Sequence, residues 1–539
     1  MMLYPIGIQD FETLRQGGFV YVDKTDLIYK LTRGHVYFLG RPRRFGKSLL
    51  VSTLKYYFLG RRDLFEGLRI MELETEWQQH PVFHFDFNRI TTPADLQEYL
   101  RISLAEWEKL YPIDITPENL ALRFSMVIAS AHKKTGRKAV VLIDEYDKPL
   151  LDLLETGRPD DAHLLQENRE LLKKFFSTFK AADEHLRFVL LTGVTKFSQI
   201  SMFSGFNQPD DISMDPRFDT LCGITGEELH TVFADGIHEL AVAYDMTEEA
   251  IKEELKLMYD GYHFSNRLVD IYNPFSLINC FSKNQIDSYW FRSGTPSLMV
   301  RLLANTQEEV MQYTSQWYLQ RMFVDYKADK EMPLPMLFQA GYLTIKAVNN
   351  LTRSYLLDYP NREVREGMMM LLTSNYLQSR ENPVSWINNM LAALQTGDTE
   401  QMRRLFTAFL AETPYSMRPK KDQKDRERLR VGEHSSGMLY FHYTFYLLMR
   451  LISCYTVYTE KQLSEGRADC IVETPEHVYI FEFKLDGTAG QALRQISDRG
   501  YARAFEADPR PVVLIGASFS SKTGTIEEWE AQLLADKNS

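Results

Sequence analysis

A short loop near the N-terminus carries residues that could bind phosphate groups. The sequence LGRPRRFGKSLL (39–50) contains Gly46-Lys47-Ser48 and lies between an apolar run, VYFLG, and an amphipathic stretch, SLLVSTLKYYF. A strand, a loop that ends in Gly-Lys-Ser and a helix form the setting of a P-loop, in which main-chain N–H groups and the helix N-terminus bind phosphate oxygens. In that setting we expect Lys47 to reach the β- and γ-phosphates and Ser48 to bind Mg²⁺.

The loop departs from the usual P-loop spacing at one position. A glycine is expected five residues before Gly46, but Arg41 stands there and Gly40 comes one residue early. A chance Gly-Lys-Ser on a basic turn is therefore an alternative interpretation. If the loop binds a nucleotide, the expected contacts are Arg43, Arg44, Phe45, Gly46, Lys47, Ser48 and Leu49.

A second motif, AVVLIDEYD (139–147), is an apolar run that ends in Asp144-Glu145. In P-loop ATPases the first acid of such a pair holds Mg²⁺ and the second polarises the attacking water. A buried strand that ends in exposed acids is the alternative. The loop and the acidic pair, in this order and 97 residues apart (Lys47 to Asp144), together predict ATP or GTP binding.

Three further residues could complete this site. Thr192 and Thr195 lie near the end of RFVLLTGVTKFS, where ATPases that insert a strand between the two motifs often have a polar residue that senses the γ-phosphate. Threonine is also an ordinary strand residue. Arg217, in DISMDPRFDTL, is a candidate arginine finger supplied to a neighbour in a homo-oligomer. An ordinary surface arginine is the alternative.

The C-terminal region carries a second chemical pattern, SEGRADCIVETPEHVYIFEFKLDG (464–487). A hairpin centred on its Thr-Pro-Glu-His turn would place Asp469 opposite Glu482, with Lys484 on the same face as Glu482. Two acids and a lysine are costly to bury, and a divalent cation bound by Asp469 and Glu482 would offset that cost. Lys484 could then activate water and stabilise charge on a phosphate. A solvent-facing, salt-bridged hairpin is the alternative.

Residues around this hairpin could support the same chemistry. Glu460, on YTVYTE, could join the two acids in binding the metal. Gln495 and Tyr501, on the next helical stretch, could contact Lys484 or the backbone.

The elements that must position the first site are four apolar runs with helical stretches between them. The runs cover residues 36–40, 81–87, 139–145 and 187–194. Buried strands that alternate with helices predict an α/β fold with a parallel sheet covered on both faces.

Beyond residue 225 the pattern changes. A capping box, Thr225-Gly226-Glu227-Glu228, predicts the start of a helix, and helical patterns cover 226–243, 247–259, 299–320 and 387–413. Residues 418–430 hold seven basic and three acidic side chains, which predicts either a solvated linker or a basic arm that contacts phosphates. Residues 431–539 read as a small domain with the order α-β-β-α-β, whose first helix covers about 438–454 and whose second covers 487–506.

Composition narrows the class of protein. The 539-residue chain has 62 Lys and Arg against 73 Asp and Glu, a net charge of -11, which argues against a wholly basic nucleic-acid binder but leaves room for a local basic groove. Its four cysteines form no CxxC pair, which argues against a disulfide scaffold or a thiolate zinc site. With no secretory pattern at the N-terminus and no long apolar run, we expect a soluble cytoplasmic protein without a membrane partner.

Longer motifs resemble known families. The first part of the chain resembles a bacterial AAA-ATPase-like domain family. The stretches that carry this resemblance are, in order, YPIGIQDFETLRQGGFVYVDKTDLI, YFLGRPRRFGKSLLVSTLKYYF, VVLIDEYDKPL, LLTGVTKFSQISMFSGFN, DISMDPRFDTLCGIT, YDGYHF and QAGYLTI. The C-terminal region resembles the PD-(D/E)XK nuclease superfamily in the stretches GRADCIVE, YIFEFKLDG and ALRQISDRGYA. The family's own loop has an arginine at the place of Arg41.

The resemblance implies a P-loop NTPase core of the ASCE type over residues 1–225, a mainly helical region and linker over 226–430, and a restriction-endonuclease-like α/β domain over 431–539. It implies ATP and Mg²⁺ as cofactors. Carried onto this sequence, it implies a nucleotide site at Lys47, Ser48, Asp144 and Glu145, and a nuclease triad of Asp469, Glu482 and Lys484 with Glu460 and Gln495 in support.

One departure concerns the nuclease. Many domains of this superfamily have a glutamate on their first helix, but GMLYFHYTFYLLMR has no acid and the nearest is Glu433. The resemblance therefore leaves two hypotheses open. The protein is an ATPase coupled to a Mg²⁺-dependent nuclease that acts on DNA or RNA, or it is an ATP-switched module that binds nucleic acid or protein through an inactive nuclease-like domain.

Overall fold

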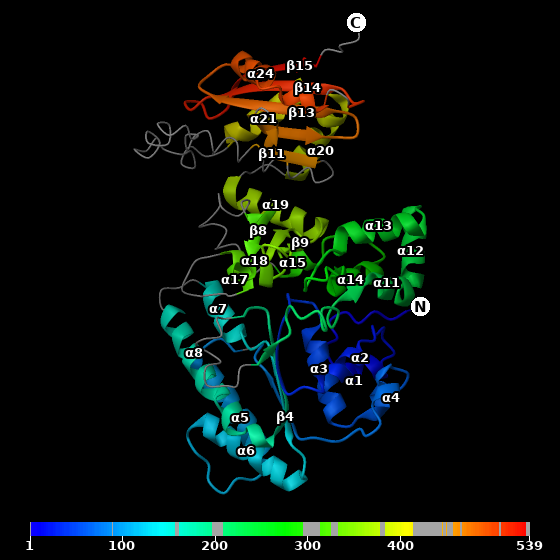
Figure 1. Ribbon diagram of the computed structural model, residues 1–539, viewed down its shortest axis with the longest axis vertical. Coiled ribbons are helices and arrows are strands. Elements are labelled where there is room, and N and C mark those ends of the chain that lie inside the picture. Colours follow the sequence, from blue (N-terminus) through cyan, green and yellow to red (C-terminus); the bar gives the residue numbers. More distant parts are fainter. Residues whose placement is uncertain are drawn as a thin grey trace. The chain divides into compact units, whose positions relative to one another are not determined.

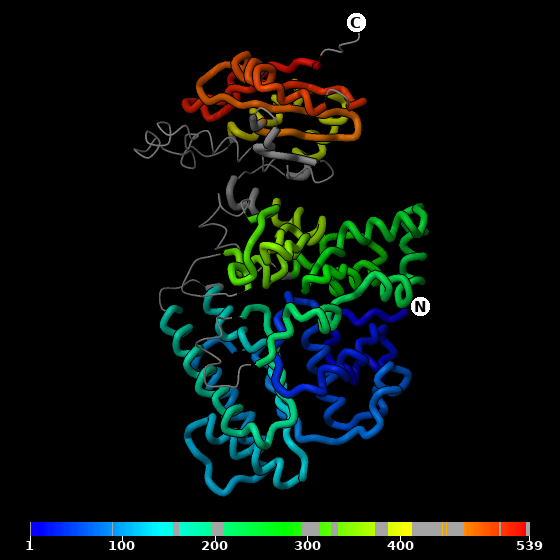
Figure 2. The backbone as a smooth tube through the Cα atoms, in the orientation of Figure 1, coloured from blue at the N-terminus to red at the C-terminus, as the bar shows by residue number. Residues whose placement is uncertain are grey.

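The computed structural model describes residues 2–88, 90–156, 161–196, 209–294, 313–324, 333–377, 383–412, 445, 449, 456–463, 466–505 and 508–534. The chain divides into two compact units, Met1–Arg365 and Glu366–Ser539. Each unit contains a five-stranded sheet, and Figures 1 and 2 follow the chain through them. The sequence-predicted boundaries near residues 225 and 430 remain a prediction.

The first sheet confirms the predicted parallel architecture. Its strands are β1 (Val36–Gly40), β2 (Val82–Asp86), β3 (Ala139–Asp144), β4 (Leu186–Gly193) and β5 (Asp210–Asp211), in the order β2-β3-β4-β1-β5. All neighbouring pairs are parallel. Strand β4 lies between β1 and β3, so the loop after β1 and the acids at the end of β3 flank an inserted strand, as in an ASCE-type core.

Helices cover both faces of this sheet. Figure 1 shows α1 (Phe11–Gln16), α2 (Thr25–Leu31), α3 (Lys47–Phe58) and α4 (Ile70–Leu73) on one side, and α5 (Pro93–Leu110), α6 (Leu120–Thr135), α7 (Lys148–Thr156) and α8 (Asp161–Phe176) on the other. Every residue of β3 is buried, as expected for a strand between two helical layers. A short helix, α9 (Thr178–Ala181), leads into β4.

The rest of the first unit mixes helices with small sheets. Its helices are α11 (Gly226–Val232), α12 (Ala234–Tyr244), α13 (Glu248–Tyr259), α14 (Pro274–Lys283), α15 (Trp290–Gly294), α17 (Gln320–Val324) and α18 (Pro333–Gln339). Strands β6 (Ile224–Thr225) and β7 (Ile271–Tyr272) pair, and β8 (Gln316–Leu319), β9 (Thr344–Asn349) and β10 (Ser354–Asp358) form a sheet in the order β8-β10-β9. The capping box at Thr225 and Glu228 is confirmed.

Two helix predictions in this part are corrected. The predicted helix 226–243 is two helices that meet at Phe233. The predicted helix 299–320 is wrong in its described part, because residues 316–319 form β8 and pair antiparallel with β10. Pairing with a strand that lies later in the chain overrides a local helical pattern.

The second unit contains helices and a mixed sheet. After α19 (Arg362–Leu377), which crosses the boundary between the units, come α20 (Pro383–Thr396), α21 (Thr399–Glu412), β11 (Thr456–Leu463), β12 (Gly466–Glu473), β13 (Val478–Leu485), α24 (Ala489–Asp498), β14 (Val512–Phe519) and β15 (Ile526–Leu533). The strand order is β11-β12-β13-β14-β15. Only β13 and β14 are parallel, which fits the predicted strand-helix-strand crossover through α24.

Two more predicted helices are shorter than expected. The stretch 387–413 divides into α20 and α21 around Gly397, whose φ of 74° is left-handed and ends a helix. The stretch 487–506 divides into α24 and a 3-10 turn, Tyr501–Phe505, around Gly500. The basic segment 418–430 and nearly all of the predicted helix 438–454 lie outside the described residues.

Candidate functional site

The loop after β1 has the backbone of an anion-binding turn. Arg44 and Gly46 have positive φ angles of 69° and 89°, and α3 begins directly afterwards at Lys47 and runs for 12 residues. Left-handed residues before a helix N-terminus are typical of the nests that bind phosphate. A left-handed arginine costs energy, which proteins tolerate mainly at functional sites.

Lys47 lies inside this loop rather than on the surface. Its side chain is buried, and Nζ donates to the main-chain oxygens of Arg41 and Pro42, both at 3.0 Å. Burial lowers the pKa of Lys47, and Glu145 and Asp144 oppose that effect. The ammonium group thus lies within the loop, in the field of the acids at the end of β3.

Asp144 is the last residue of β3 and Glu145 follows it, next to the predicted sensor residue on β4. One carboxylate oxygen of Asp144, Oδ1, accepts hydrogen bonds from the Thr192 hydroxyl at 2.6 Å and from the Glu145 N–H at 3.1 Å. Burial raises the pKa of Glu145, while Lys47 lowers it. The structure therefore brings Lys47, Asp144, Glu145 and Thr192 together at one edge of the sheet.

An apolar pocket adjoins the loop at Gly46 and Leu49. It is lined by residues of four chain segments, among them Pro5, Tyr21, Val22, Leu49, Ile224 and Pro274. Lys24 also lines it and forms a 2.6 Å ion pair with Glu228. Concave, mostly apolar pockets with a few polar groups suit small ligands, and this one could receive the base of a nucleotide whose phosphates lie on the loop.

The other predicted nucleotide residues have varied surroundings. Ser48 and Leu49 are half-buried in the first turn of α3. The Arg44 guanidinium lies 4.9 Å from the centre of the Phe275 ring. Phe45 is buried against Tyr262 and Phe264, so its side chain belongs to the core. Arg217 is exposed and pairs with Asp215 of its own chain, and its role toward a neighbouring subunit remains a prediction.

The second site is built on the β12–β13 hairpin. The register pairs Cys470 with Phe481 and Ile471 with Ile480, as predicted from the turn, and its continuation places Asp469 opposite Glu482. Asp469 Oδ2 accepts a hydrogen bond of 2.8 Å from the Phe483 N–H. The two candidate metal ligands thus lie on neighbouring strands.

Lys484 is held by two acceptors. Its Nζ lies 3.3 Å from Glu482 Oε1 and 2.6 Å from Gln495 Oε1 on α24. The predicted contact between Gln495 and the lysine is therefore present. Tyr501, in contrast, is buried in the core of this unit with Ile480 and Leu514.

Glu482 is a buried carboxylate with an unsatisfied oxygen. Its side chain is 2% exposed, and Oε2 is buried without a hydrogen-bond partner. Burial, and next the charge of Asp469, raise the pKa of Glu482 to about 8, while Lys484 opposes them. Such an oxygen beside a second carboxylate fits a hard divalent cation, which would provide the missing partner.

Within the described part of the chain, no three His, Cys, Asp or Glu side chains gather as a metal site. A cation held by Asp469 and Glu482 would therefore need further oxygens, from the Phe483 carbonyl, water or a phosphate. The register of β11 places position 460 opposite Asp469, because Thr459 pairs with Cys470 and Lys461 with Ala468. The Glu460 side chain lies outside what the structure describes.

Comparisons with known proteins agree with this architecture. The profile of a family described as "Predicted AAA-ATPase" matches residues 5–203, and that of the "PD-(D/E)XK nuclease superfamily" matches residues 439–529. A protein of Azotobacter chroococcum mcd 1, named "Uncharacterized protein in vnfD 5'region", is 35% identical over 530 residues, which cover 97% of each chain. The chain belongs to the family of this protein and joins an AAA-ATPase-like domain to a PD-(D/E)XK domain.

Among solved structures, that of Cdc6p from Pyrobaculum aerophilum aligns with 66% of this AAA-ATPase-like chain and 95% of its own, at 11% identity and a TM-score of 0.22. Within the described residues, no helix is long and apolar enough to cross a bilayer.

Two functional features of this AAA-ATPase-like chain were missed in the sequence. The first is Asp147, a buried residue whose Oδ2 accepts hydrogen bonds from the N–H groups of Val194 and Thr195 and from the Thr195 hydroxyl. It ties the ends of β3 and β4 together, so Thr195 contacts Asp147 rather than Asp144. The sequence feature that could have revealed this role is a third acid, Asp147, two residues after Glu145.

The second feature is the role of Arg41. Its buried guanidinium donates to the main-chain oxygens of Gly40, Ser213 and Phe218 and lies 4.2 Å from the centre of the Phe264 ring. Arg41 is therefore a support beneath the loop, which explains how an arginine can occupy the position of the usual glycine.

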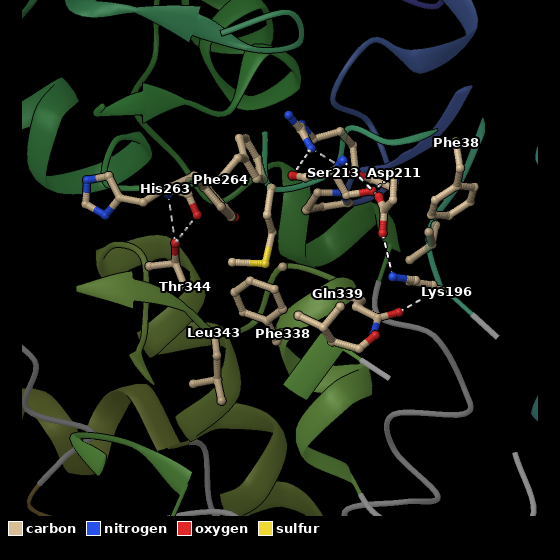
Figure 3. A pocket seen from close by; sticks show the side chains of 18 residues that line it. Phe38, Lys196, Asp211, Ser213, His263, Phe264, Phe338, Gln339, Leu343 and Thr344 are labelled. Carbon is tan, nitrogen blue, oxygen red and sulfur yellow. Dashed lines mark hydrogen bonds and ion pairs between the residues drawn. The ribbon is translucent and has the colours of Figure 1, made fainter. Parts of the chain in front are cut away.

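A further pocket lies against the loop at Gly40, Arg41 and Pro42 (Figure 3). Its polar groups bond to one another: Lys196 Nζ lies 2.6 Å from Asp211 Oδ2, and the Lys196 N–H donates to Gln339 Oε1 at 2.6 Å. These bonds tie Lys196, three residues after the end of β4, to β5 and α18, so they hold the pocket walls together.

Proposed function

We propose that this protein binds and hydrolyses ATP at the loop and uses the nucleotide to control a Mg²⁺-dependent nuclease in its second unit. The observation that carries the proposal is the meeting of Lys47, Asp144, Glu145 and Thr192 at one edge of a parallel sheet with an inserted strand. The family's AAA-ATPase-like and PD-(D/E)XK domains support both halves. We further propose a cytoplasmic location.

In the first site each residue has a distinct task. The N–H groups of the loop and Lys47 bind the phosphates, and Ser48 and Asp144 are placed to hold Mg²⁺. Bound Mg²⁺ supplies charge neutralisation and orientation of the phosphates. Glu145 is placed to polarise the attacking water, and its raised pKa makes it a stronger proton acceptor than a solvent-exposed glutamate.

In the second site Asp469 and Glu482 would hold the divalent cation, which supplies a Lewis acid and a more acidic water. Lys484, fixed by Gln495, is placed to orient water and to stabilise negative charge on a phosphate of DNA or RNA. The buried, unpartnered Oε2 of Glu482 supports metal binding over a solvent-facing salt bridge.

Two measurements test the proposal. Glu145→Gln should retain ATP binding but slow hydrolysis, because the amide cannot accept the proton. Plasmid or single-stranded DNA incubated with Mg²⁺ and ATP should be cut by the wild-type chain and not by Asp469→Ala. Equal cleavage by both proteins would remove the nuclease from the proposal.

A second function, ATP-switched binding without cleavage, is favoured by one observation: the stretch GMLYFHYTFYLLMR has no acid, although many domains of this superfamily have a glutamate on that helix. It predicts retention on nucleic acid that depends on ATP, weakens with salt and produces no new ends. New ends that vanish in Asp469→Ala would eliminate it. Use of Arg217 in trans by a homo-oligomer is part of either proposal.

A further inference from the structure

The phosphate-binding loop is held by residues that lie more than 200 positions later in the chain. Arg41 packs on Phe264, the Arg44 guanidinium lies over Phe275, and Phe45 contacts Tyr262. These contacts involve side chains. One further contact holds the loop's main chain: the indole N–H of Trp290 donates to the carbonyl oxygen of Arg43 at 3.0 Å.

Trp290 is itself fixed from both sides. The indole is buried, and its ring centre lies 5.4 Å from that of Tyr342. Its main-chain N–H donates to Glu363 Oε1 at 2.7 Å and to the Ser276 hydroxyl at 3.2 Å. Contacts to its ring and to its main chain therefore set the position of the Trp290 indole beside the loop.

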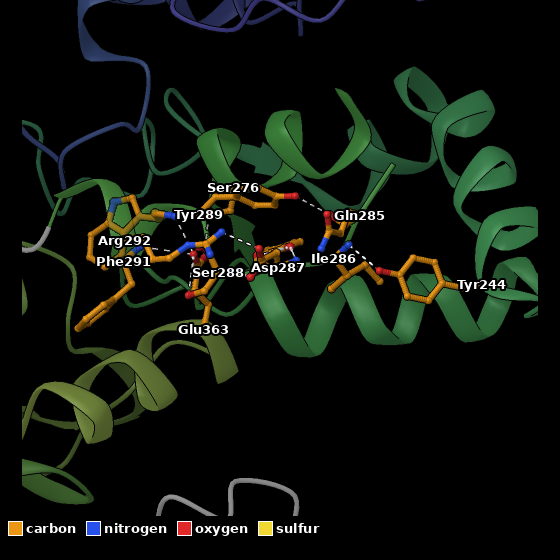
Figure 4. A network of polar contacts seen from close by, with 12 residues as sticks. Tyr244, Ser276, Gln285, Ile286, Asp287, Ser288, Tyr289, Phe291, Arg292 and Glu363 are labelled. Atoms are coloured by element: carbon orange, nitrogen blue, oxygen red, sulfur yellow. Dashed lines mark hydrogen bonds and ion pairs between the residues drawn. The ribbon is translucent and has the colours of Figure 1, made fainter. Parts of the chain in front are cut away.

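Glu363 holds the main chain of Trp290 in place (Figure 4). Its carboxylate is 1% exposed, and it accepts hydrogen bonds from the Ser276 hydroxyl at 2.7 Å and from the N–H of Trp290. A buried carboxylate is costly unless its oxygens are bonded. The hydrogen bonds that satisfy the oxygens of Glu363 thus also determine where the Trp290 indole can lie.

A bond to the Arg43 carbonyl has a consequence for phosphate binding. The peptide unit is planar and trans, so its C=O and N–H point in opposite directions. Fixing the carbonyl of Arg43 therefore also fixes the direction of the Arg44 N–H. That N–H precedes Gly46 and Lys47 in the turn and is one of the donors that a P-loop offers to phosphate oxygens.

We propose that Trp290 is a positioning residue of the nucleotide site, which presets the Arg43–Arg44 peptide for a nucleoside di- or triphosphate. The inference rests on the proposed nucleotide function of the loop. It makes the region after β7 a part of the phosphate site through its contact with the main chain of the loop.

The test measures nucleotide affinity on the full chain by calorimetric titration. Trp290→Phe keeps an aromatic ring but removes the N–H, and should weaken Mg·ATP and Mg·ADP binding by roughly fivefold, the effect of one net hydrogen bond. AMP, which lacks the outer phosphates, should bind with unchanged affinity. Replacing Trp290 by benzothienylalanine, an isostere without the N–H, should give the same pattern even if the phenylalanine variant folds poorly.

Trp386→Phe is the matched control. Trp386 is equally buried and donates its indole N–H to the Leu405 carbonyl at 3.2 Å in the second unit, so its variant loses the same kind of bond and should keep normal ATP affinity. Unchanged ATP affinity in both Trp290 variants, or an equal loss for ATP and AMP, would overturn the inference. A wild-type chain that binds no ATP would overturn the proposed function itself.

Discussion

The two candidate sites differ in how their parts are distributed along the chain. Asp469, Glu482, Lys484 and Gln495 belong to one hairpin and the helix that follows it. The phosphate loop, in contrast, depends on Asp144, on Thr192 and on a group of aromatic residues between positions 262 and 342. The difference teaches that a local site can form with its own supersecondary unit, whereas the loop acquires its geometry only when the whole first unit has folded.

The largest expected effects separate the two sites. Lys47→Ala should lower ATP affinity by about 100-fold or more, because the ammonium is the main charge offered to the phosphates. Lys484→Ala should lower DNA cleavage by about 100-fold and leave ATP affinity unchanged. Titration with Mg·ATP and a gel assay for new ends measure the two effects. If Lys484→Ala weakened ATP binding, the two sites would not be as separate as their residues suggest.

The next effect concerns the support beneath the loop. Arg41→Gly would bring the loop closer to the usual P-loop pattern, yet it removes a buried guanidinium that bonds three main-chain oxygens. We expect a loss of about 3 kcal/mol in the free energy of unfolding of the first unit, measured by urea titration with hydrogen exchange on β1. The exposed Arg217 serves as a control, and Arg217→Gly should change stability little. Equal stability of Arg41→Gly and wild type would show that the support is dispensable.

A smaller effect tests how local the second site is. Gln495→Leu removes the acceptor that holds Lys484 at 2.6 Å, so the ammonium would lose its orientation and cleavage should fall about tenfold. Gln495→Glu keeps an acceptor oxygen and should retain more activity. The ratio of cleavage rates for these two variants is the measurement. A Gln495→Leu protein as active as wild type would mean that Glu482 alone orients the lysine.

The last effect is a pH dependence confined to the second site. The pKa of Glu482 is raised to about 8 from an ordinary value of 4.5, so the folded state binds a proton that the unfolded chain releases. Its contribution to stability is complete below about pH 4.5 and is lost as the pH rises through 8. In metal-free buffer, Glu482→Gln should therefore gain stability over wild type between pH 6 and pH 9.

Thermal unfolding of both proteins at these two pH values checks this expectation. Adding Mg²⁺ at pH 9 should stabilise the wild type and not the glutamine variant, because the cation needs the ionised carboxylate. A difference between the proteins that stays constant from pH 6 to pH 9 would contradict the raised pKa.

Some elements were not predictable from local pattern. Strand β15 was missed because four of its eight residues are polar, and it forms only as the edge partner of β14. Strand β8 was mistaken for a helix because its partner, β10, lies 35 or more residues later. An edge strand takes its conformation from its neighbour, and neighbours distant in sequence leave no mark on local periodicity.

By itself, the sequence determined the four buried strands of the first sheet, the strand-loop-helix around Lys47 and the register that sets Asp469 opposite Glu482. Each follows from side-chain periodicity and turn residues within a few positions of one another. Only the tertiary structure decided that Arg41 and Phe45 face inward, that Asp147 joins β3 to β4 and that Trp290 holds the Arg43 carbonyl. These contacts connect segments up to 247 positions apart, and such pairs meet only because the hydrophobic core forces the chain to close, which no short stretch of sequence can specify.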